Sequence, residues 1–234
     1  MESIVFQKLP THIAFILDGN GRWANKHGMK RTMGHIKGVK TLKNIVKEVK
    51  ALNIKYMSVY AFSVENFSRP QEEVNFLMEK ALTEFSKLES RLSELDFNVR
   101  VIGERDNLDS RILKVIDKLN STPFNEEHFT LFIAFNYSSQ LEIINASKEM
   151  KKRKLAFTKE NFEKCLYTYP APPIDLLIRT SHEQRLSNFM LYQASYAELY
   201  FPSVFWPAFT KRSLYKALEE YQKRDRKFGQ IRGW

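Results

Sequence analysis

Short apolar runs alternate with amphipathic stretches along this chain of 234 residues. A short apolar run between polar turns predicts a buried strand, and apolar residues spaced three or four apart predict a helix. Strands are accordingly expected at 12–17, 56–62, 97–102, 130–135, 174–178 and 199–201. Helices are expected at 34–52, 71–95, 106–119, 138–151, 158–165 and from 211 onward, with a loop at 63–70 and an extended segment at 169–173.

This alternation predicts an α/β fold, with a mostly parallel central sheet of about six strands covered by helices on both faces. No internal repeat, low-complexity tract or flexible linker interrupts the pattern, so we expect a single domain over residues 1–234. The helix at 71–95, the strand at 56–62, Phe132 and Phe135 are apolar enough to line a long cavity or tunnel. The same helical periodicity is also that of an ordinary core helix.

The most informative polar motif follows the first predicted strand. The apolar run 13–17 ends in Asp18-Gly19-Asn20-Gly21-Arg22-Trp23. Glycines let backbone N–H groups approach an anion, a following helix offers its positive end, and a carboxylate is useful where a divalent metal bridges it to phosphate. A plain strand-to-helix turn needs only one glycine and a capping residue. The motif therefore indicates a phosphate site, with an ordinary turn as the alternative.

Polar loops also follow other predicted strands, at 63–69, 136–137 and 179–188. The carboxyl ends of parallel strands share one edge of the sheet, where ligands bind in α/β folds. The anion-binding side chains expected at this edge are Arg22, Arg31, His35, Arg69, Arg179, Arg185 and Ser187. Because the planar fork of Arg donates two hydrogen bonds to phosphate, this set predicts two phosphate groups. Asp18 and Glu198 are the carboxylates that we assign to magnesium.

Charge narrows the choice of partner. Lys and Arg number 37 against 27 Asp and Glu, and the net charge of +10 favours phosphates, nucleic acid or an acidic membrane surface. Lysines at 40, 43, 47 and 50 lie opposite an apolar helix face, which indicates a solvated surface and disfavours nucleic acid. The basic C-terminal segment is either a solvated helix or a contact for anionic lipid headgroups; it contains Lys211, Arg212, Lys216, Lys223, Arg224, Arg226, Lys227 and Arg232.

The chain has few other groups or segments that indicate a function. The single Cys165 cannot form an internal disulfide, and Ser63 and Ser187 lack a histidine at a recognisable spacing that would make either one a nucleophile. No run approaches the roughly 18 apolar residues of a spanning helix. Residues 1–10 lack the basic and apolar regions of a signal peptide. We therefore expect a soluble cytoplasmic protein, with peripheral contact to the inner face of the membrane left open.

Four long motifs resemble those of the cis-prenyltransferases, in particular the bacterial undecaprenyl diphosphate synthases. They are His12–Trp23, Arg31 with Gly34-His35, Tyr60–Pro70 followed by Glu73-Val74, and Asp175–Leu199, and the resemblance covers about residues 12–230. It implies a homodimeric enzyme that uses Mg²⁺ to condense isopentenyl diphosphate onto an allylic diphosphate such as farnesyl diphosphate. The implied product is a polyprenyl diphosphate such as undecaprenyl diphosphate, a lipid carrier in cell-wall synthesis.

The resemblance also implies roles for individual residues. Asp18 would bind magnesium and assist departure of the allylic diphosphate, and Glu198 would complete the metal site, within the protomer or across the dimer. The allylic diphosphate would be held by Gly19, Asn20, Gly21, Arg22, Trp23, Arg31, His35 and Arg69, and isopentenyl diphosphate by Arg179, Arg185 and Ser187. A mobile closing loop would contain Ser63, Glu65, Asn66 and Phe67, and the implied catalytic residues are Asp18, Asn20, Ser63 and Asn66. The released proton would pass to a diphosphate oxygen or through a Ser63/Asn20 relay.

The chain departs from the family pattern at three places. Phe67 stands where Trp is usual, 138–140 is Ser-Ser-Gln in place of two glycines and an arginine, and His182 stands where glycine is usual. We expect the His182 imidazole to reshape the isopentenyl pocket. The alternatives to an elongating synthase are a non-catalytic partner subunit and a family member that makes a shorter or different prenyl diphosphate. Retention of Asp18 and the arginines favours catalysis.

Overall fold

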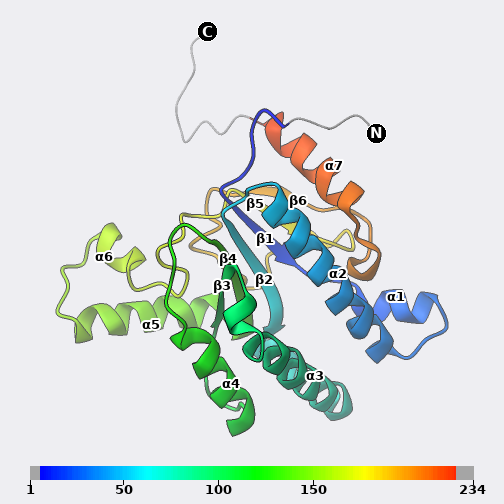
Figure 1. The fold of residues 1–234 in the computed structure, drawn as a ribbon, viewed down its shortest axis with the longest axis horizontal. Coiled ribbons are helices and arrows are strands. Elements are labelled where there is room, and N and C mark those ends of the chain that lie inside the picture. Colours follow the sequence, from blue (N-terminus) through cyan, green and yellow to red (C-terminus); the bar gives the residue numbers. More distant parts are fainter. Residues whose placement is uncertain (1–5, 225–234) are drawn as a thin grey trace.

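A six-stranded parallel sheet forms the centre of the protein, which the computed structural model describes over residues 6–224 (Figure 1). Its strand order is β3-β4-β2-β1-β5-β6, and every neighbouring pair is parallel. The strands are β1 (His12–Ile16), β2 (Tyr56–Ser63), β3 (Phe97–Ile102), β4 (Phe129–Tyr137), β5 (Leu176–Arg179) and β6 (Glu198–Tyr200). The predicted α/β class and the six-stranded sheet are confirmed.

Seven α-helices and three short 3₁₀ helices connect the strands in the described part of the chain. They are α1 (Asn20–Lys26), α2 (Arg31–Ala51), η1 (Val64–Ser68), α3 (Gln71–Glu89), η2 (Leu92–Glu94), α4 (Ser110–Ser121), α5 (Ser139–Lys152), α6 (Lys159–Glu163), η3 (Trp206–Ala208) and α7 (Lys211–Gln222). Helix α1 was not predicted, because its residues lack an apolar period, and neither was η1, which occupies the predicted loop at 63–70. The helix predicted at 71–95 ends earlier, at Glu89.

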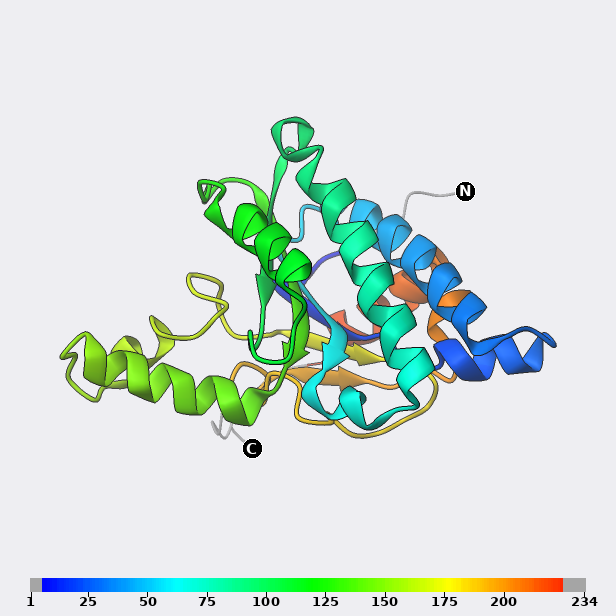
Figure 2. The same ribbon diagram turned by 90° about the horizontal axis from the view of Figure 1, so that it is seen from below.

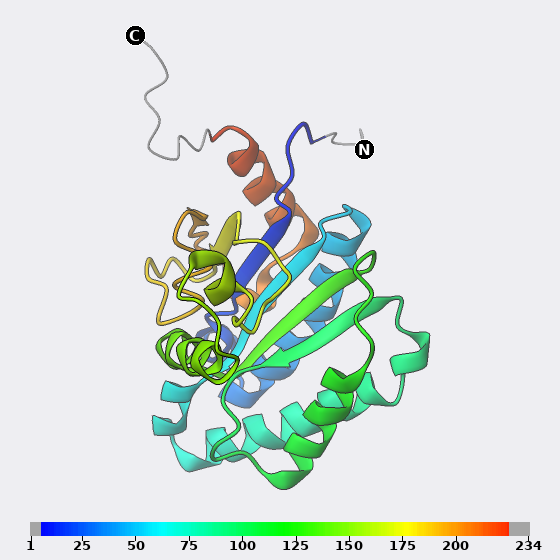
Figure 3. The same ribbon diagram turned by 90° about the vertical axis from the view of Figure 1, so that its left-hand side faces the viewer.

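The two faces of the sheet are covered differently (Figures 2 and 3). Helices α2, α3, α4 and α7 pack over one face through apolar side chains that include Ile45, Phe85, Ile116 and Leu218. The other face is packed mainly by residues of the two connections that flank β5, from α6 to β5 and from β5 to β6, such as Phe189. Helices α5 and α6 lie beside that face around a small core of their own. Helices therefore cover chiefly one face, where the sequence predicted cover on both.

One predicted cavity residue lies on the wrong face. Side chains alternate along a strand, so Leu131, Ile133 and Phe135 of β4 share the core that packs under α3, whereas Phe132 points to the opposite face. Phe132 therefore cannot line a cavity with α3, which corrects the prediction. The apolar side of α3, including Phe85, packs against the core next to Phe135.

The sheet order places the ends of β1 and β5 side by side. From β1 the chain passes to β2 on one side of it, and β5 later joins β1 on the other side. Ligands bind at such a switch point in α/β sheets, beyond the carboxyl ends of the strands. None of the helices in residues 6–224 is both long and apolar enough to cross a membrane.

Two glycines of α2 set the position of α1. A Cβ atom on Gly34 would lie 1.9 Å from the backbone oxygen of Asn20, and one on Gly38 would lie 2.3 Å from Oδ1 of Asn20. The chain enters α1 through Gly19, whose left-handed φ of 96° favours glycine. Any side chain at Gly34 would therefore displace α1.

We predict that Gly34→Ala destabilises the protein by about 1–3 kcal/mol, the range for overpacked sites. In an open helix the same change would add up to about 1 kcal/mol of stability, because alanine is the better helix former. Denaturant unfolding measures the difference. Lys37→Ala, at an exposed position of the same helix, is the control and should change stability by less than about 0.5 kcal/mol. A stabilised Gly34→Ala variant would contradict the close packing of α1 on α2.

The ring of His12 lies inside the protein at the start of β1. Its Nδ1 is 2.8 Å from the carbonyl oxygen of Pro172, and its Nε2 is 2.8 Å from the hydroxyl oxygen of Ser58. Burial lowers the pKa of His12 to about 4, because desolvation disfavours the charged imidazolium. His12 is therefore neutral in the folded protein at neutral pH.

This burial predicts a loss of stability in mild acid. As the pH falls below about 6.5, the unfolded chain gains the His12 proton first, so the free energy of unfolding falls until the folded-state pKa of about 4 is passed. The contribution of His12 amounts to about 3 kcal/mol between pH 7 and pH 4. Urea unfolding across this range should show a shallower pH dependence in His12→Gln than in the natural protein. Equal slopes would rule out the buried neutral imidazole.

Candidate active site

A small polar pocket lies at the carboxyl end of β1. Its volume is about 100 Å³, and its lining residues are Leu17, Asp18, Gly19, Asn20, Gly21, Arg22, Arg31, His35 and Arg69. Eight of these nine were predicted as site residues from the sequence; the ninth is Leu17. They come from the β1–α1 turn, α1, the start of α2 and the segment before α3. The structure therefore brings together residues that lie up to 51 positions apart in the sequence (18 to 69).

Asp18 joins two arginines from different elements. Its Oδ1 accepts a hydrogen bond from Arg22 Nη2 at 3.0 Å, and its Oδ2 accepts one from Arg179 Nη2 at 2.9 Å. The Asp18 backbone oxygen accepts further bonds from the Thr180 hydroxyl and from the Trp206 backbone N–H. Arg179 is buried at the end of β5, and its Nη1 donates to the Ser187 hydroxyl oxygen at 2.7 Å. Asp18 is thus held at the point where β1 and β5 end.

Glu183 extends this cluster toward the second predicted phosphate subsite. Its Oε1 accepts from Arg22 Nη1 at 2.5 Å, and its Oε2 accepts from Arg185. These hydrogen bonds lower the pKa of Glu183, so the carboxylate is charged at neutral pH. The predicted isopentenyl residues Arg179, Arg185 and Ser187 therefore form one group that is connected to Arg22 through Glu183. Glu183 was not among the predicted site residues, although it stands between the predicted residues Arg179 and Arg185.

Glu73 holds the other cations of the pocket. Its carboxylate accepts hydrogen bonds from Arg31 Nε at 3.1 Å and from Arg69 Nη1 at 3.1 Å, and His35 Nε2 lies 3.4 Å from its Oε1. Glu73 is buried in the first turn of α3, and it was not among the predicted site residues. In the sequence, Glu73 follows Arg69 by four residues where α3 begins, and this spacing could have predicted that the two side chains pair.

Burial and charge act in opposite directions on this second cluster. Burial alone would raise the pKa of Glu73, but the hydrogen bond from Arg31 and the charges of Arg31 and Arg69 outweigh it and lower that pKa. Burial lowers the pKa of His35 more than the neighbouring Glu73 carboxylate raises it. At neutral pH the cluster therefore contains two charged arginines, one carboxylate and a neutral imidazole.

The segment predicted as a closing loop is ordered around η1. Ser63 and Asn66 form a reciprocal capping box, in which the Ser63 backbone N–H donates to Asn66 Oδ1 at 3.2 Å. Glu65 accepts a hydrogen bond from Asn188 Nδ2 at 3.1 Å, which ties the segment to the loop after β5. Phe67 packs edge-to-face on Phe62 of β2, with the ring centroids 5.1 Å apart. Ser63 and Asn66 thus cap η1, and Phe67 packs against the core.

The three departures from the family pattern have distinct placements. His182 is exposed and has a left-handed φ of 59°, so its ring does not fill the pocket. The Ser138 hydroxyl oxygen accepts from Asn188 Nδ2, and the Ser139 hydroxyl oxygen accepts from the Leu191 backbone N–H at 2.9 Å. These two serines therefore fasten the loop after β5 to the start of α5. The expectation that His182 reshapes the pocket by its bulk finds no support in its exposed position.

Two further predicted residues have partly structural roles. Asn20 Nδ2 donates to the backbone oxygen of Leu17 at 3.0 Å, and its Oδ1 is buried against Gly38 without a hydrogen-bond partner in the described residues. The Trp23 ring lies on the ring of His27, with centroids 4.4 Å apart. Asn20 therefore shapes the turn more than it faces the open pocket.

Glu198 lies at the amino end of β6, whereas Asp18 lies beyond the carboxyl end of β1. It is level with Leu176 of β5, which in turn is level with Ile13 of β1. Asp18 follows five residues after Ile13, which corresponds to roughly 16 Å along the strand direction. Glu198 instead accepts a hydrogen bond from Arg224 Nη1 at 3.0 Å. Within one protomer the two carboxylates are therefore not brought together.

Among the predicted metal ligands, only Asp18 is placed where Mg²⁺ could bind together with a substrate phosphate. No three His, Cys, Asp or Glu side chains of residues 6–224 gather as a metal-binding group. Asp18 offers a single carboxylate whose side chain is 25% exposed beside the cationic pocket. Mg²⁺ is commonly bound by one or two carboxylates together with substrate phosphates and water. Asp18 therefore suits an ion that binds together with a diphosphate.

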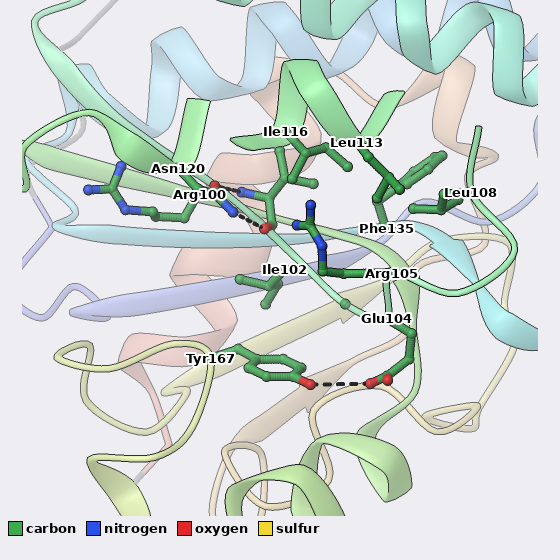
Figure 4. A pocket seen from close by; sticks show the side chains of 12 residues that line it. Arg100, Ile102, Glu104, Arg105, Leu108, Leu113, Ile116, Asn120, Phe135 and Tyr167 are labelled. Carbon is green, nitrogen blue, oxygen red and sulfur yellow. Dashed lines mark hydrogen bonds between the residues drawn. The ribbon is translucent and has the colours of Figure 1, made fainter. Parts of the chain in front are cut away.

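A larger cavity of about 280 Å³ lies elsewhere, between β3 and α4 (Figure 4). Ile102, Leu113 and Phe135 give it an apolar side, while the Tyr167 hydroxyl donates to Glu104 at its other side. It contains none of the predicted site residues. Asn120, at its margin, exchanges two hydrogen bonds with the backbone of Val101 and so covers the edge of β3.

Comparison with known proteins agrees with this geometry. Residues 16–229 match the family described as putative undecaprenyl diphosphate synthase. The isoprenyl transferase of Fusobacterium nucleatum is 42% identical, with 97% of this chain and 98% of that protein covered. The isoprenyl transferase of Thermotoga maritima is also 42% identical, with 95% and 97% covered.

Two solved structures share the fold. Lavandulyl diphosphate synthase from Lavandula x intermedia, in complex with dimethylallyl diphosphate, superposes with a TM-score of 0.85 at 30% identity, covering 94% of this chain and 98% of that one. A probable undecaprenyl diphosphate synthase from Campylobacter jejuni superposes with a TM-score of 0.79 at 29% identity, covering 96% and 100%. Since sequence identity extends over nearly the whole of both chains and the folds agree, this protein belongs to the undecaprenyl diphosphate synthase family of isoprenyl transferases.

Proposed function

We propose that this protein elongates an allylic diphosphate, with farnesyl diphosphate as the primer, by adding isopentenyl diphosphate units to give a polyprenyl diphosphate such as undecaprenyl diphosphate. The observation that carries the proposal is the pair of cation clusters on either side of Asp18. Arg31, His35 and Arg69 gather around Glu73 on one side, and Arg179 and Arg185 lie near Ser187 on the other. Arg22 lines the same pocket as the first cluster and is linked to the second through Asp18 and Glu183.

Each cluster suits one diphosphate. The allylic diphosphate would bind in the pocket at Arg22, Arg31, His35 and Arg69, with the Gly19 and Gly21 backbone next to it. Isopentenyl diphosphate would bind at Arg179, Arg185 and Ser187. Arginine forks fix the orientation of each phosphate by paired hydrogen bonds. The two organic groups would then meet near Asp18, where β1 and β5 end.

The reaction would break the C–O bond of the allylic diphosphate and form a C–C bond to the terminal alkene carbon of isopentenyl diphosphate. Arg22, Arg31 and Arg69 would stabilise the negative charge that grows on the leaving diphosphate. Mg²⁺ held by Asp18 and the diphosphate would supply Lewis-acid stabilisation of the same charge. A role for Glu198 at this metal depends on the homodimer that we also propose, because Glu198 is remote from Asp18 in its own protomer.

A diphosphate oxygen is the proposed acceptor of the released proton. Asn20 Oδ1 is buried against Gly38, and the Ser63 hydroxyl is engaged in the capping box of η1. Neither group is therefore well placed to begin a relay. The growing apolar chain would extend away from Asp18 under α3, on the face of the sheet that contains Phe135 and Val59.

The first test combines purified protein, Mg²⁺, farnesyl diphosphate and labelled isopentenyl diphosphate, with the products sized by chromatography. We expect a ladder that ends in a long polyprenyl diphosphate, and a fall in turnover of about 10²–10³-fold in Asp18→Asn, since a neutral amide would hold Mg²⁺ at the leaving diphosphate more weakly than the carboxylate does. Dimethylallyl diphosphate, the ligand in the lavender structure, is the alternative primer. A single condensation from that primer would indicate a short-chain synthase, and no reaction with any primer would favour a partner subunit.

The second test separates the two subsites. Arg31→Gln should raise the KM for the allylic diphosphate by at least tenfold and change the KM for isopentenyl diphosphate less. Arg185→Gln should do the reverse, because Arg185 lies in the other cluster. Each variant loses a hydrogen-bonding charge that contributes about 1.5–3 kcal/mol. Steady-state kinetics with one substrate varied at a time provide the measurement. Equal effects on both KM values in both variants would contradict two separate subsites.

A further inference from the structure

An exposed apolar stripe lies on the outer side of the α1–α2 hairpin. Met29, just before α2, is 39% exposed, and Met33 and Ile36, in its first two turns, are 45% and 41% exposed. Large apolar side chains are usually covered, and here three of them follow one another along one side of a helix. The turn between α1 and α2 projects at one end of the molecule in two perpendicular views (Figures 1 and 2).

This stripe takes no part in folding α2. The buried residues of the helix are Gly34, Gly38, Thr41, Ile45 and Val49, which pack toward α1, the sheet and η3. The outer residues have no covering element in the described part of the chain, where all three stay more than one-third exposed. The stripe is therefore available to a partner.

Lysines surround the stripe. Lys26, Lys30, Lys37 and Lys40 are all exposed, and none of them lies within 4.0 Å of a carboxylate from residues 6–224. Some other surface lysines are paired, for example Lys43 with Glu84 and Lys211 with Glu48. Apolar side chains among unpaired cations fit a surface that is apolar beneath and negatively charged on top.

We propose that the α1–α2 hairpin docks on an anionic lipid bilayer. Met29, Met33 and Ile36 would enter the boundary between headgroups and acyl chains, and the four lysines would contact lipid phosphates. The opposite side of the same hairpin contains Arg31 and His35, which line the pocket at Asp18. Docking would therefore hold that pocket about one helix diameter, roughly 10 Å, from the membrane surface. The docking itself does not depend on the proposed function.

Two other basic surfaces are weaker candidates. On α7, Lys211 and Lys223 pair with Glu48 and Glu220, and the helix exposes no comparable apolar stripe. At the α5–α6 turn, Phe157 is 80% exposed, but it is a single apolar residue, and Glu149 pairs with nearby Arg153. Leu141 and Ile144 of α5 are also exposed, at 37% and 49%, but the hairpin places three such side chains among four unpaired lysines within residues 26–40 of the described chain.

Vesicle flotation of the full chain tests the proposal. The vesicles contain equal parts phosphatidylglycerol and phosphatidylcholine, with phosphatidylcholine alone for comparison. Lys30→Gln/Lys37→Gln should lower partitioning into the anionic vesicles by about 25-fold, at about fivefold per lysine. Met33→Ser/Ile36→Ser should lower it at least tenfold, because the apolar contact is lost. All variants should keep the unfolding midpoint of the natural protein, since the changed side chains are exposed.

The controls assign binding to this surface. Arg212→Gln/Lys216→Gln removes the same charge from α7, and Phe157→Ser removes the most exposed large apolar side chain of the described residues, which lies outside the hairpin; both should bind vesicles as the natural protein does. Asp18→Asn should also bind normally, so an inactive enzyme would not count against docking. Excess inorganic diphosphate with Mg²⁺ should not release the protein, because it occupies the pocket and not the stripe. Equal loss in the α7 variant, release by diphosphate, or full binding by both hairpin variants would overturn the proposal.

Discussion

The site depends on one ion pair, between Asp18 after β1 and Arg179 at the end of β5. Arg179 is only 4% exposed, so its charge needs the Asp18 carboxylate at 2.9 Å and the Ser187 hydroxyl at 2.7 Å. Removing one partner of a buried pair commonly costs about 3–5 kcal/mol, because the other charge is left desolvated. The pair therefore fixes the β1–α1 turn against the loop after β5. The two proposed diphosphate subsites are built on those two segments.

Three carboxylates organise the remaining cations before any substrate binds. Asp18, Glu73 and Glu183 each accept hydrogen bonds from two arginines, so the arginines converge without facing one another unpaired. A diphosphate bound as proposed would meet guanidinium groups already held in place, which would lower the cost of orienting them. α2 contributes to this arrangement on two sides: its glycines seat α1, and its first turns supply Arg31 and His35 to the pocket. Its third side carries the exposed apolar stripe and the lysines.

Most of the fold was predictable from local pattern. The bounds of the strands predicted to begin at residues 12, 56, 97 and 130 agree with the structure within one or two residues, because each strand is a compact apolar run between polar turns. Helix α1 was missed, since its polar residues are held by contact with Gly34 and Gly38 and not by an apolar period of their own. Phe132 was placed on the wrong face, because apolar runs buried on both sides hide the alternation that would reveal it. Glu73 and Glu183 were not selected, since their importance lies in pairing with distant arginines.

The sequence by itself determined the class of fold, the family and the set of candidate anion-binding residues. Each of these depends on residue type and local spacing, which are properties of the linear sequence alone. The tertiary structure decided which of those residues meet. It brought Asp18 to Arg179 and Arg31 to Glu73, and it left Glu198 at the amino end of β6. Strand order and register control such distances, and they arise from contacts between segments far apart in the chain, so no local pattern encodes them.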